Sequence, residues 1–192
     1  MRERANLARF ARTDVMAAVP RSLTTDRLLL RPLTLDDAPF IMELVTEPDW
    51  IRFIGDKNVH GLDDARRYLR DGPLKMYAEH GVGSLCVELR ATGEPVGVCG
   101  LIRRPGLEDV DIGFAFLERH RGKGYGAESS LAILEHARNE LRIARVVAIT
   151  TPDNAASMAL LEKIGLRYER DVALPSRSDP SRLFGIDLQT RA

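Results

Sequence analysis

Apolar residues follow two different periods in the middle of the chain, and the change of period falls at a run of glycines. From 110 to 116 they alternate with small or polar residues, which is typical of a strand packed mainly on one face. From 127 to 141 they recur every three or four positions, which predicts a helix. Gly122, Gly124 and Gly126 stand at alternate positions between the two segments. The sequence therefore predicts a strand, a glycine loop and a helix in direct succession.

The same patterns predict six more strands and three more helical segments. We expect the strands over residues 27–33, 83–90, 95–103, 145–150, 166–174 and 182–188. We expect the helices over residues 34–44, 63–79 with an interruption at Gly72 and Pro73, and 155–164. Thr34 and Asp37 form a capping-box pattern at the first helix, and Pro48 is expected to end it. Trp50 and Phe53 would then lie in an irregular segment.

Length and composition indicate an ordinary globular chain. It has 192 residues, of which 44% are hydrophobic and 29% charged, and its formal net charge is zero. A neutral chain has no overall field that favours nucleic acid or an anionic membrane, so neither partner is expected. No apolar run approaches the eighteen or so residues that cross a bilayer. We expect one domain over residues 22–192, preceded over residues 1–21 by a poorly ordered extension or a weak amphipathic helix.

The two cysteines indicate the redox state of the cellular compartment in which the protein is found. Cys86 and Cys99 lie in apolar strand-like runs, and their spacing is not that of a metal site. We therefore expect buried free thiols rather than a disulfide, and no bound metal. Free thiols are typical of a reducing compartment, which indicates a cytoplasmic protein.

The glycine loop has the chemistry of an anion site. Glycine allows positive φ and lets a ligand approach the backbone closely. The first turn of the following helix has N–H groups without partners inside the helix and carries the positive end of its dipole. Arg121 and Lys123 add formal charge, so we expect the loop to hold a diphosphate.

Two other interpretations of the loop remain open at this point. Gly122, Gly124 and Ala127 also match the G-x-G-x-x-G/A pattern of nicotinamide-dinucleotide enzymes. That pattern opens a βαβ unit, with an acidic residue about twenty positions later. Here over a hundred residues precede the loop, and the next expected strand ends in Thr150 and Thr151, which disfavours it. The simpler alternative is a glycine-rich helix entry with solvated charges.

Three motifs occur along the chain in a recognisable order. Arg121, Gly124 and Gly126 fill the signature Arg/Gln-x-x-Gly-x-Gly/Ala. Residues 154–166 resemble Asn-x-x-Ser-x-x-x-Leu-Glu-Lys-x-Gly-Phe, and residues 23–32 resemble an opening strand found with the other two. Together they resemble the GNAT superfamily of N-acetyltransferases, in particular the branch that contains the ribosomal-protein-alanine acetyltransferases (RimJ/RimL type).

This resemblance covers roughly residues 22–189 and implies both fold and activity. The implied fold is α/β (α+β), with a mixed, mostly antiparallel sheet of about seven strands, splayed between the fourth and fifth, and about four flanking helices. The implied activity is acetyl transfer from acetyl-CoA to a primary amine of a small molecule or a protein N-terminus, by direct attack in a ternary complex. The resemblance also allows a homodimer. A non-catalytic acyl-CoA-binding module is the alternative.

The resemblance also assigns the residues that would bind coenzyme A. Backbone groups of Phe114, Ala115 and Phe116 would pair with the pantetheine arm. The diphosphate would lie against Arg121, Gly122, Lys123, Gly124, Tyr125, Gly126 and Ala127. Asn154 would hydrogen-bond the arm, although Asn at this place is also a favoured helix N-cap.

The catalytic residues are less well marked. Many relatives have a tyrosine at the position of Leu161 that protonates the leaving thiolate, and Ser157 lies one turn earlier on the same face. Ser157 would be that acid or only a small spacer. Some relatives use a glutamate as the general base, but this chain has Ile149 at that position. Asp111 would be the general base instead, or it is merely an edge or solvent-facing aspartate. His60, His80, His120 and a chain of waters are further candidates.

By the same resemblance, the acceptor would bind between the first two helices and the last hairpin. The residues there are Trp50, Phe53 and a loop over residues 175–181 that contains Arg177. An aromatic pair after a helix is more often part of a core than a substrate wall.

Overall fold

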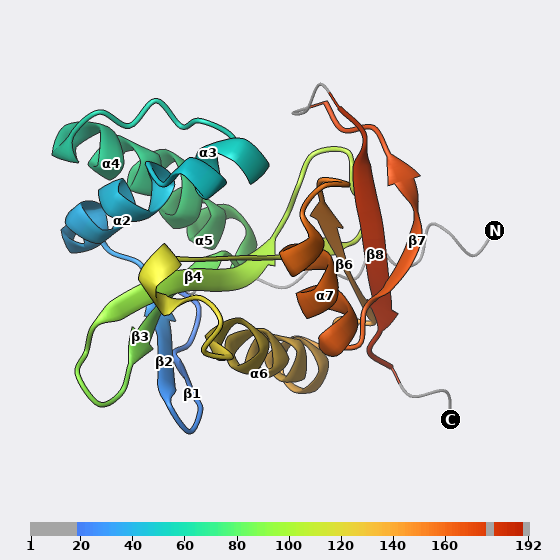
Figure 1. The fold of residues 1–192 in the computed structure, drawn as a ribbon. Coiled ribbons are helices and arrows are strands. Elements are labelled where there is room, and N and C mark those ends of the chain that lie inside the picture. Colours follow the sequence, from blue (N-terminus) through green and yellow to red (C-terminus); the bar gives the residue numbers. More distant parts are fainter. Residues whose placement is uncertain (1–18, 176–178, 190–192) are drawn as a thin grey trace.

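A computed structural model describes residues 19–175 and 179–189 of the chain (Figure 1). Most of the expected extension over residues 1–21, and Arg177 of the candidate acceptor loop, lie outside the described residues. Eight strands form one sheet in the order β1-β2-β3-β4-β5-β6-β8-β7. The strands are β1 Leu23–Thr24, β2 Leu28–Pro32, β3 Ser84–Leu89, β4 Pro95–Ile102, β5 Val110–Phe116, β6 Arg145–Thr150, β7 Arg167–Val172 and β8 Ser181–Asp187.

The sheet is mixed and mostly antiparallel, as predicted. Every neighbouring pair is antiparallel except β5 and β6, which run parallel. The strand beyond the seven expected is β1, whose two residues pair with Leu29 and Leu30 at one edge. A strand of two residues is too short to show a period in the sequence.

The described helical segments fall between the strands. They are η1 Leu35–Asp37, α2 Ala38–Val45, α3 Pro48–Phe53, α4 Leu62–Leu69, the π-helical turn η2 Arg70–Leu74, α5 Lys75–His80, η3 Glu118–His120, α6 Tyr125–Asn139 and α7 Ala155–Lys163. The expected irregular segment after Pro48 is wrong, because Pro48 begins α3 and both aromatic residues lie in that helix. Proline suits a first helical position, where the N–H has no partner within the helix. Gly72 and Pro73 do not break the second helical segment either, since η2 carries the chain from α4 into α5.

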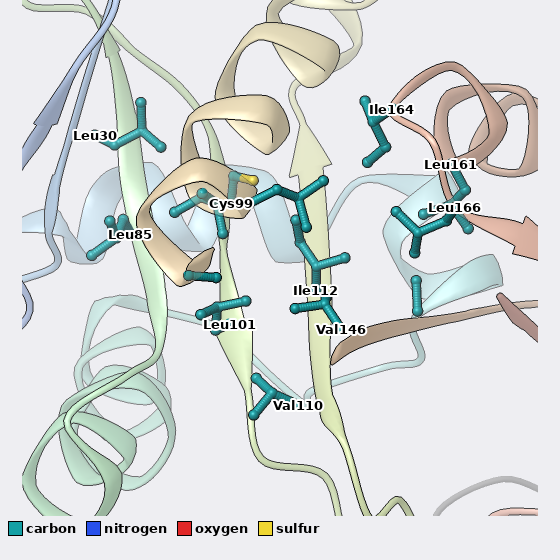
Figure 2. Packing of buried hydrophobic residues seen from close by; sticks show 14 of the residues in the cluster. Leu30, Leu85, Cys99, Leu101, Val110, Ile112, Val146, Leu161, Ile164 and Leu166 are labelled. Carbon is teal, nitrogen blue, oxygen red and sulfur yellow. The ribbon is translucent and has the colours of Figure 1, made fainter. Parts of the chain in front are cut away.

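Helices cover both faces of the sheet, and a separate group of buried side chains lies under each helical layer. One group joins the sheet to α6 and α7, and Figure 2 shows part of it, with Leu161 of α7 next to Leu166. The other joins the sheet to α2, α3 and α4. Val98 and Cys99 are consecutive residues that belong to different groups, because neighbouring side chains of a strand point to opposite faces.

Two expectations from composition can be compared with the described residues. Cys86 and Cys99 are fully buried free thiols, as predicted. Burial raises the pKa of Cys86 to about 12 and that of Cys99 to about 11, so both stay protonated at neutral pH. No helix in the described part of the chain is long and apolar enough to cross a membrane.

The sheet opens between its two parallel strands. β5 and β6 pair only at Val110 with Val146 and at Asp111 with Val147. Beyond these pairs, β5 continues along β4 as far as Phe116, while β6 continues along β8. The predicted splay between these strands is therefore confirmed.

A buried ion pair fixes the start of the α2 segment to the sheet. Asp37 completes the predicted capping box by accepting the N–H of Thr34 at 2.7 Å. Arg31 of β2 donates to both oxygens of Asp37, at 2.8 and 2.6 Å, and to Glu88 of β3 at 2.7 Å. Burial alone would raise the pKa of the Asp37 carboxyl, but the Arg31 guanidinium and the Thr34 N–H hold it below its usual range.

We expect Asp37→Asn to lower the free energy of unfolding by about 2–3 kcal/mol at pH 7, because charge-assisted bonds to a buried group are lost. Since the folded-state pKa is the lower one, the carboxylate stabilises the fold above about pH 3.9, and this contribution disappears as pH falls through the folded-state pKa. Urea unfolding at pH 7 and pH 3 measures both the loss of unfolding free energy and its dependence on pH. Asp63→Asn, at an exposed pair with Arg66, is the control and should change little. A difference that stays constant with pH would contradict the ion-pair explanation.

Candidate functional site

The loop before α6 has the backbone conformation that an anion cradle requires. Gly122 has φ of 73° and Gly124 has φ of 84°, in the left-handed region that other residues rarely adopt. Gly124 is the N-cap of α6, so the free N–H groups and the positive dipole end of the helix begin there. The structure therefore places a left-handed glycine turn directly against a helix N-terminus.

Gly126 serves a different purpose from the two loop glycines. It lies inside the first turn of α6, and a Cβ at this position would be 2.9 Å from Cδ2 of Leu160 in α7. It would also lie 3.6 Å from the ring of Phe116. The missing side chain thus lets α6 pass close to α7 and to the end of β5.

Arg121 is bound to protein groups on all sides of its guanidinium. Its Nε donates to the carbonyl oxygen of Phe116 at 2.8 Å. Its two terminal nitrogens bind the carboxylates of Glu47 and Asp49, at the start of α3. The Arg121 side chain therefore connects the end of β5 with α3, and an approaching phosphate would compete with two carboxylates for it.

The separated part of β5 presents backbone groups on its open side. The N–H of Leu117 donates to Val96 of the β4 segment at 3.0 Å, whereas the carbonyl of Phe116 turns away from β4 and accepts from Arg121. Backbone groups of successive residues in an antiparallel pair alternate in direction. The N–H and C=O of Phe114 therefore face the opened side, and those of Ala115 face β4. An extended ligand can pair with Phe114 as an added strand would.

Asn154 and Ser157 lie at the start of α7. Asn154 is the helix N-cap, and its Oδ1 accepts the N–H of Ser157 at 3.0 Å. The cap uses the amide oxygen and leaves the amide nitrogen able to donate to a ligand. Ser157 is half-buried, and Leu161 on the same face is only 1% exposed within the core.

Asp111 lies at the point where β5 and β6 separate. It is the last β5 residue that pairs with β6, and it is 1% exposed. Its Oδ2 accepts from Nε and Nη2 of Arg104 at 2.8 and 2.7 Å. The alternative of an edge or solvent-facing aspartate is therefore wrong. Strand alternation directs the Asp111 side chain to the face opposite Ile112, away from α6.

The aromatic residues of the candidate acceptor site differ in exposure. Trp50 is 7% exposed and belongs to the core under α2 and α4, whereas Phe53 is half-buried with Arg52 stacked 4.8 Å from its ring centre. Arg52 also donates to Asp153 at 2.8 Å. Through this bond α3 contacts the turn that leads into α7. Trp50 is thus placed as a core residue and Phe53 as a partly accessible one.

The three candidate histidines differ in their surroundings. His60 and His80 are exposed, and His120 is buried with Nε2 2.9 Å from an oxygen of Glu94. Among the described residues, no group of three or more His, Cys, Asp and Glu side chains could hold a metal ion. His120 lies directly before Arg121 of the glycine loop, with its ring bound to Glu94.

Two basic residues at the site were missed by sequence reasoning. Arg27, from the turn between β1 and β2, donates to the carbonyl oxygen of Lys123 at 3.0 Å. Arg104, from the segment between β4 and β5, binds Asp111. Arg27 does lie within the opening-strand motif, which gave a signal, but nothing near Arg104 in the sequence indicates its partner.

Comparisons with known proteins agree with this geometry. Residues 27–167 match the family model described as an acetyltransferase (GNAT) domain. The Bacillus subtilis protein YkkB is 33% identical over 156 residues, which cover 78% of this chain and 87% of YkkB. A crystal structure of an acetyltransferase from Agrobacterium tumefaciens superposes with a TM-score of 0.73 at 28% identity, covering 91% of this chain and 98% of the other. RimL, a ribosomal-protein α-N-acetyltransferase solved in complex with coenzyme A, gives a TM-score of 0.70 at 17% identity over 87% of this chain and 98% of its own.

We expect Gly124→Val to weaken coenzyme A binding by about 100-fold or more, because a β-branched side chain resists φ of 84° and would move the loop's N–H donors out of alignment. Isothermal calorimetry with coenzyme A measures the loss. Gly81→Val is the matched control, since Gly81 has φ of 66° at the end of α5 and open space around it. Equal affinities in the two variants would show that the diphosphate is held elsewhere.

Proposed function

Because the chain belongs to the GNAT family of acetyltransferases, we propose that it transfers the acetyl group of acetyl-CoA to a primary amine of a small molecule or a protein N-terminus. The family assigns acetyl transfer from acetyl-CoA, and the acceptor and the residue roles below are the proposal. The proposal rests on one observation: the left-handed glycine turn at the start of α6 follows the end of β5, beyond the point where β5 stops pairing with β6.

The chain offers suitable groups for each part of the coenzyme. The turn from Gly122 to Ala127 would take the diphosphate through backbone N–H groups. The open side of β5 at Phe114 and Phe116 would pair with the pantetheine arm, with Ala115 providing the backbone between them. The amide nitrogen of Asn154 would donate to the same arm from the other side of the opening. Acetyl-CoA supplies the thioester that is transferred.

Asp111 is the proposed general base. It lies where the strands part, on the face opposite α6, so an amine can approach the thioester from the side away from the coenzyme loop. The amine must lose a proton as its nitrogen bonds to the acetyl carbon and the carbon–sulfur bond breaks. Arg104 holds the Asp111 carboxylate in place through two bonds to Oδ2.

Ser157 is the proposed donor of a proton to the departing sulfur. Its position one turn before Leu161 places its hydroxyl on the same face of α7, near the cap that Asn154 forms. A thiolate with a parent pKa of about 8.5 is a tolerable leaving group, so this assistance is modest. Water takes the same role if Ser157 is only a small spacer.

We extend the proposal to the ribosomal-protein acetyltransferase branch on the motifs at residues 23–32 and 154–166, a resemblance that also allows a homodimer. The free thiols of Cys86 and Cys99 support a cytoplasmic location as part of the proposal. The competing function is a non-catalytic acyl-CoA-binding module, favoured by Leu161 and Ile149 where relatives have catalytic residues. The two functions differ in whether an amine is consumed.

Thiol release from acetyl-CoA with a panel of amines and N-terminal peptides tests the proposal, alongside calorimetry with coenzyme A. Binding and amine-dependent thiol release support the enzyme. Binding without release with any amine supports the module, and absence of binding rejects both.

We expect Asp111→Asn to lower the rate at neutral pH and to recover partly at high pH, where more of the amine is already unprotonated. Arg104→Gln is the companion variant: it keeps the Asp111 carboxylate but removes the two bonds that hold it, so it should lower the rate less than Asp111→Asn does. Both variants lose the ion pair, but only Asp111→Asn loses the base. Thermal unfolding of both variants measures the stability that the lost ion pair costs, so this effect can be told apart from the loss of the base. Parallel pH–rate profiles for wild type and Asp111→Asn would remove Asp111 from the mechanism.

We expect Ser157→Ala to reduce turnover by about 10- to 100-fold if the hydroxyl protonates the thiolate, with little change in coenzyme A affinity. The backbone N–H that Asn154 caps is kept in this variant. Ser157→Leu is the second variant, and it should block the coenzyme in either case by filling the space beside the cap. Full turnover in Ser157→Ala would end the acid assignment.

A further inference from the structure

Arg27 lies directly against the tip of the glycine loop. Besides its bond to the carbonyl of Lys123, its guanidinium is 4.8 Å from the centre of the Tyr125 ring. Its Nη2 is 3.3 Å from the position that a Cβ would take at Gly124. The residue thus lies against three consecutive residues of the loop, although 96 positions separate it from Lys123 in the sequence.

Glu128 in the first turn of α6 holds Arg27 in this position. Its Oε2 accepts from Nε of Arg27 at 2.7 Å, and its Oε1 accepts from the backbone N–H of Arg27 at 2.9 Å. The same Oε1 accepts from the hydroxyl of Thr25 at 2.6 Å. The carboxylate therefore fixes the backbone and the side chain of Arg27 together, and the guanidinium has little freedom to leave the loop.

The bond to Lys123 fixes a peptide group that could otherwise turn over. Lys123 lies between Gly122 and Gly124, which both have positive φ, and glycine adopts either sign of φ at little cost. The peptide between Lys123 and Gly124 is trans, so the Lys123 carbonyl and the Gly124 N–H point in opposite directions. If this peptide turned over, a carbonyl oxygen would replace an N–H donor at the anion side of the loop.

We propose that Arg27 is a positioning residue for coenzyme A, which holds the Lys123 carbonyl outward and thereby keeps the Gly124 N–H directed at the diphosphate. The inference rests on the proposed function, because acetyl-CoA supplies the diphosphate. Arg27 acts through the backbone of the loop, so its effect is confined to ligands that carry the diphosphate. Pantetheine, which has the arm but no diphosphate, is therefore the discriminating ligand.

The test compares wild type, Arg27→Met and the control Arg66→Met. Arg66 matches Arg27 in side-chain exposure, 47% against 49%, and has one carboxylate partner, but it lies on α4. Calorimetry with coenzyme A should show binding about 10- to 100-fold weaker in Arg27→Met and unchanged in Arg66→Met. NMR titration with pantetheine should give the same affinity in all three. The amide signal of Gly124 should shift or split in Arg27→Met alone.

The possible results test two separate claims, the role of Arg27 and the proposed function. Wild-type affinity for coenzyme A in Arg27→Met, or equal losses for coenzyme A and pantetheine, would overturn the role of Arg27 while leaving the proposed function intact. A wild-type protein that does not bind coenzyme A would reject the proposed function itself. If Arg27→Met does not fold, Arg27→Lys keeps the charge but loses the planar pair of bonds, and it should weaken coenzyme A binding in the same selective way.

Discussion

The short pairing between β5 and β6 is the constraint on which the rest of the structure depends. Two residue pairs hold these strands parallel, and beyond them each strand keeps only its outer neighbour. Parallel strands require a crossover, and α6 provides it. The N-terminus of α6 therefore lies at the end of β5, where β5 no longer pairs with β6. Unpaired strand groups and free helix N–H groups meet there, and both favour one extended, anionic ligand.

Side chains of the α3 segment link the residues that follow β5 to those that follow β6, where the two strands no longer pair. Glu47 and Asp49 at its start bind Arg121 beside β5, and Arg52 near its end binds Asp153 after β6. These contacts differ in strength. Arg52 and Asp153 are 63% and 54% exposed, so their pair contributes little to stability. Arg121 has two carboxylates and a backbone carbonyl as partners, so α3 is held more firmly beside β5 than beside α7.

The sequence predicted those parts of the fold that depend on local pattern. The β-branched apolar run at residues 145–150 predicted β6 with its observed bounds, and the capping box at Thr34 and Asp37 formed as expected. Pro48 shows the limit of such patterns, because proline both follows one helix and begins another. The partners of Arg121 could not be predicted at all. Glu47 and Asp49 lie 74 and 72 residues away, and only the folded sheet brings them to the loop.

This arrangement changes how the site attracts an anion. The sequence suggested that Arg121 and Lys123 supply positive charge, yet Arg121 is neutralised by two carboxylates and Arg27 by Glu128. Within the described part of the loop, Lys123 is the cation without an ion-pair partner. In the proposed site, the attraction for a diphosphate would therefore come mainly from oriented N–H groups and the dipole of α6, which act at short range and need correct geometry. A site of this kind depends on residues that hold the backbone in place, and for that reason the bond from Arg27 to a carbonyl oxygen counts for more than its charge.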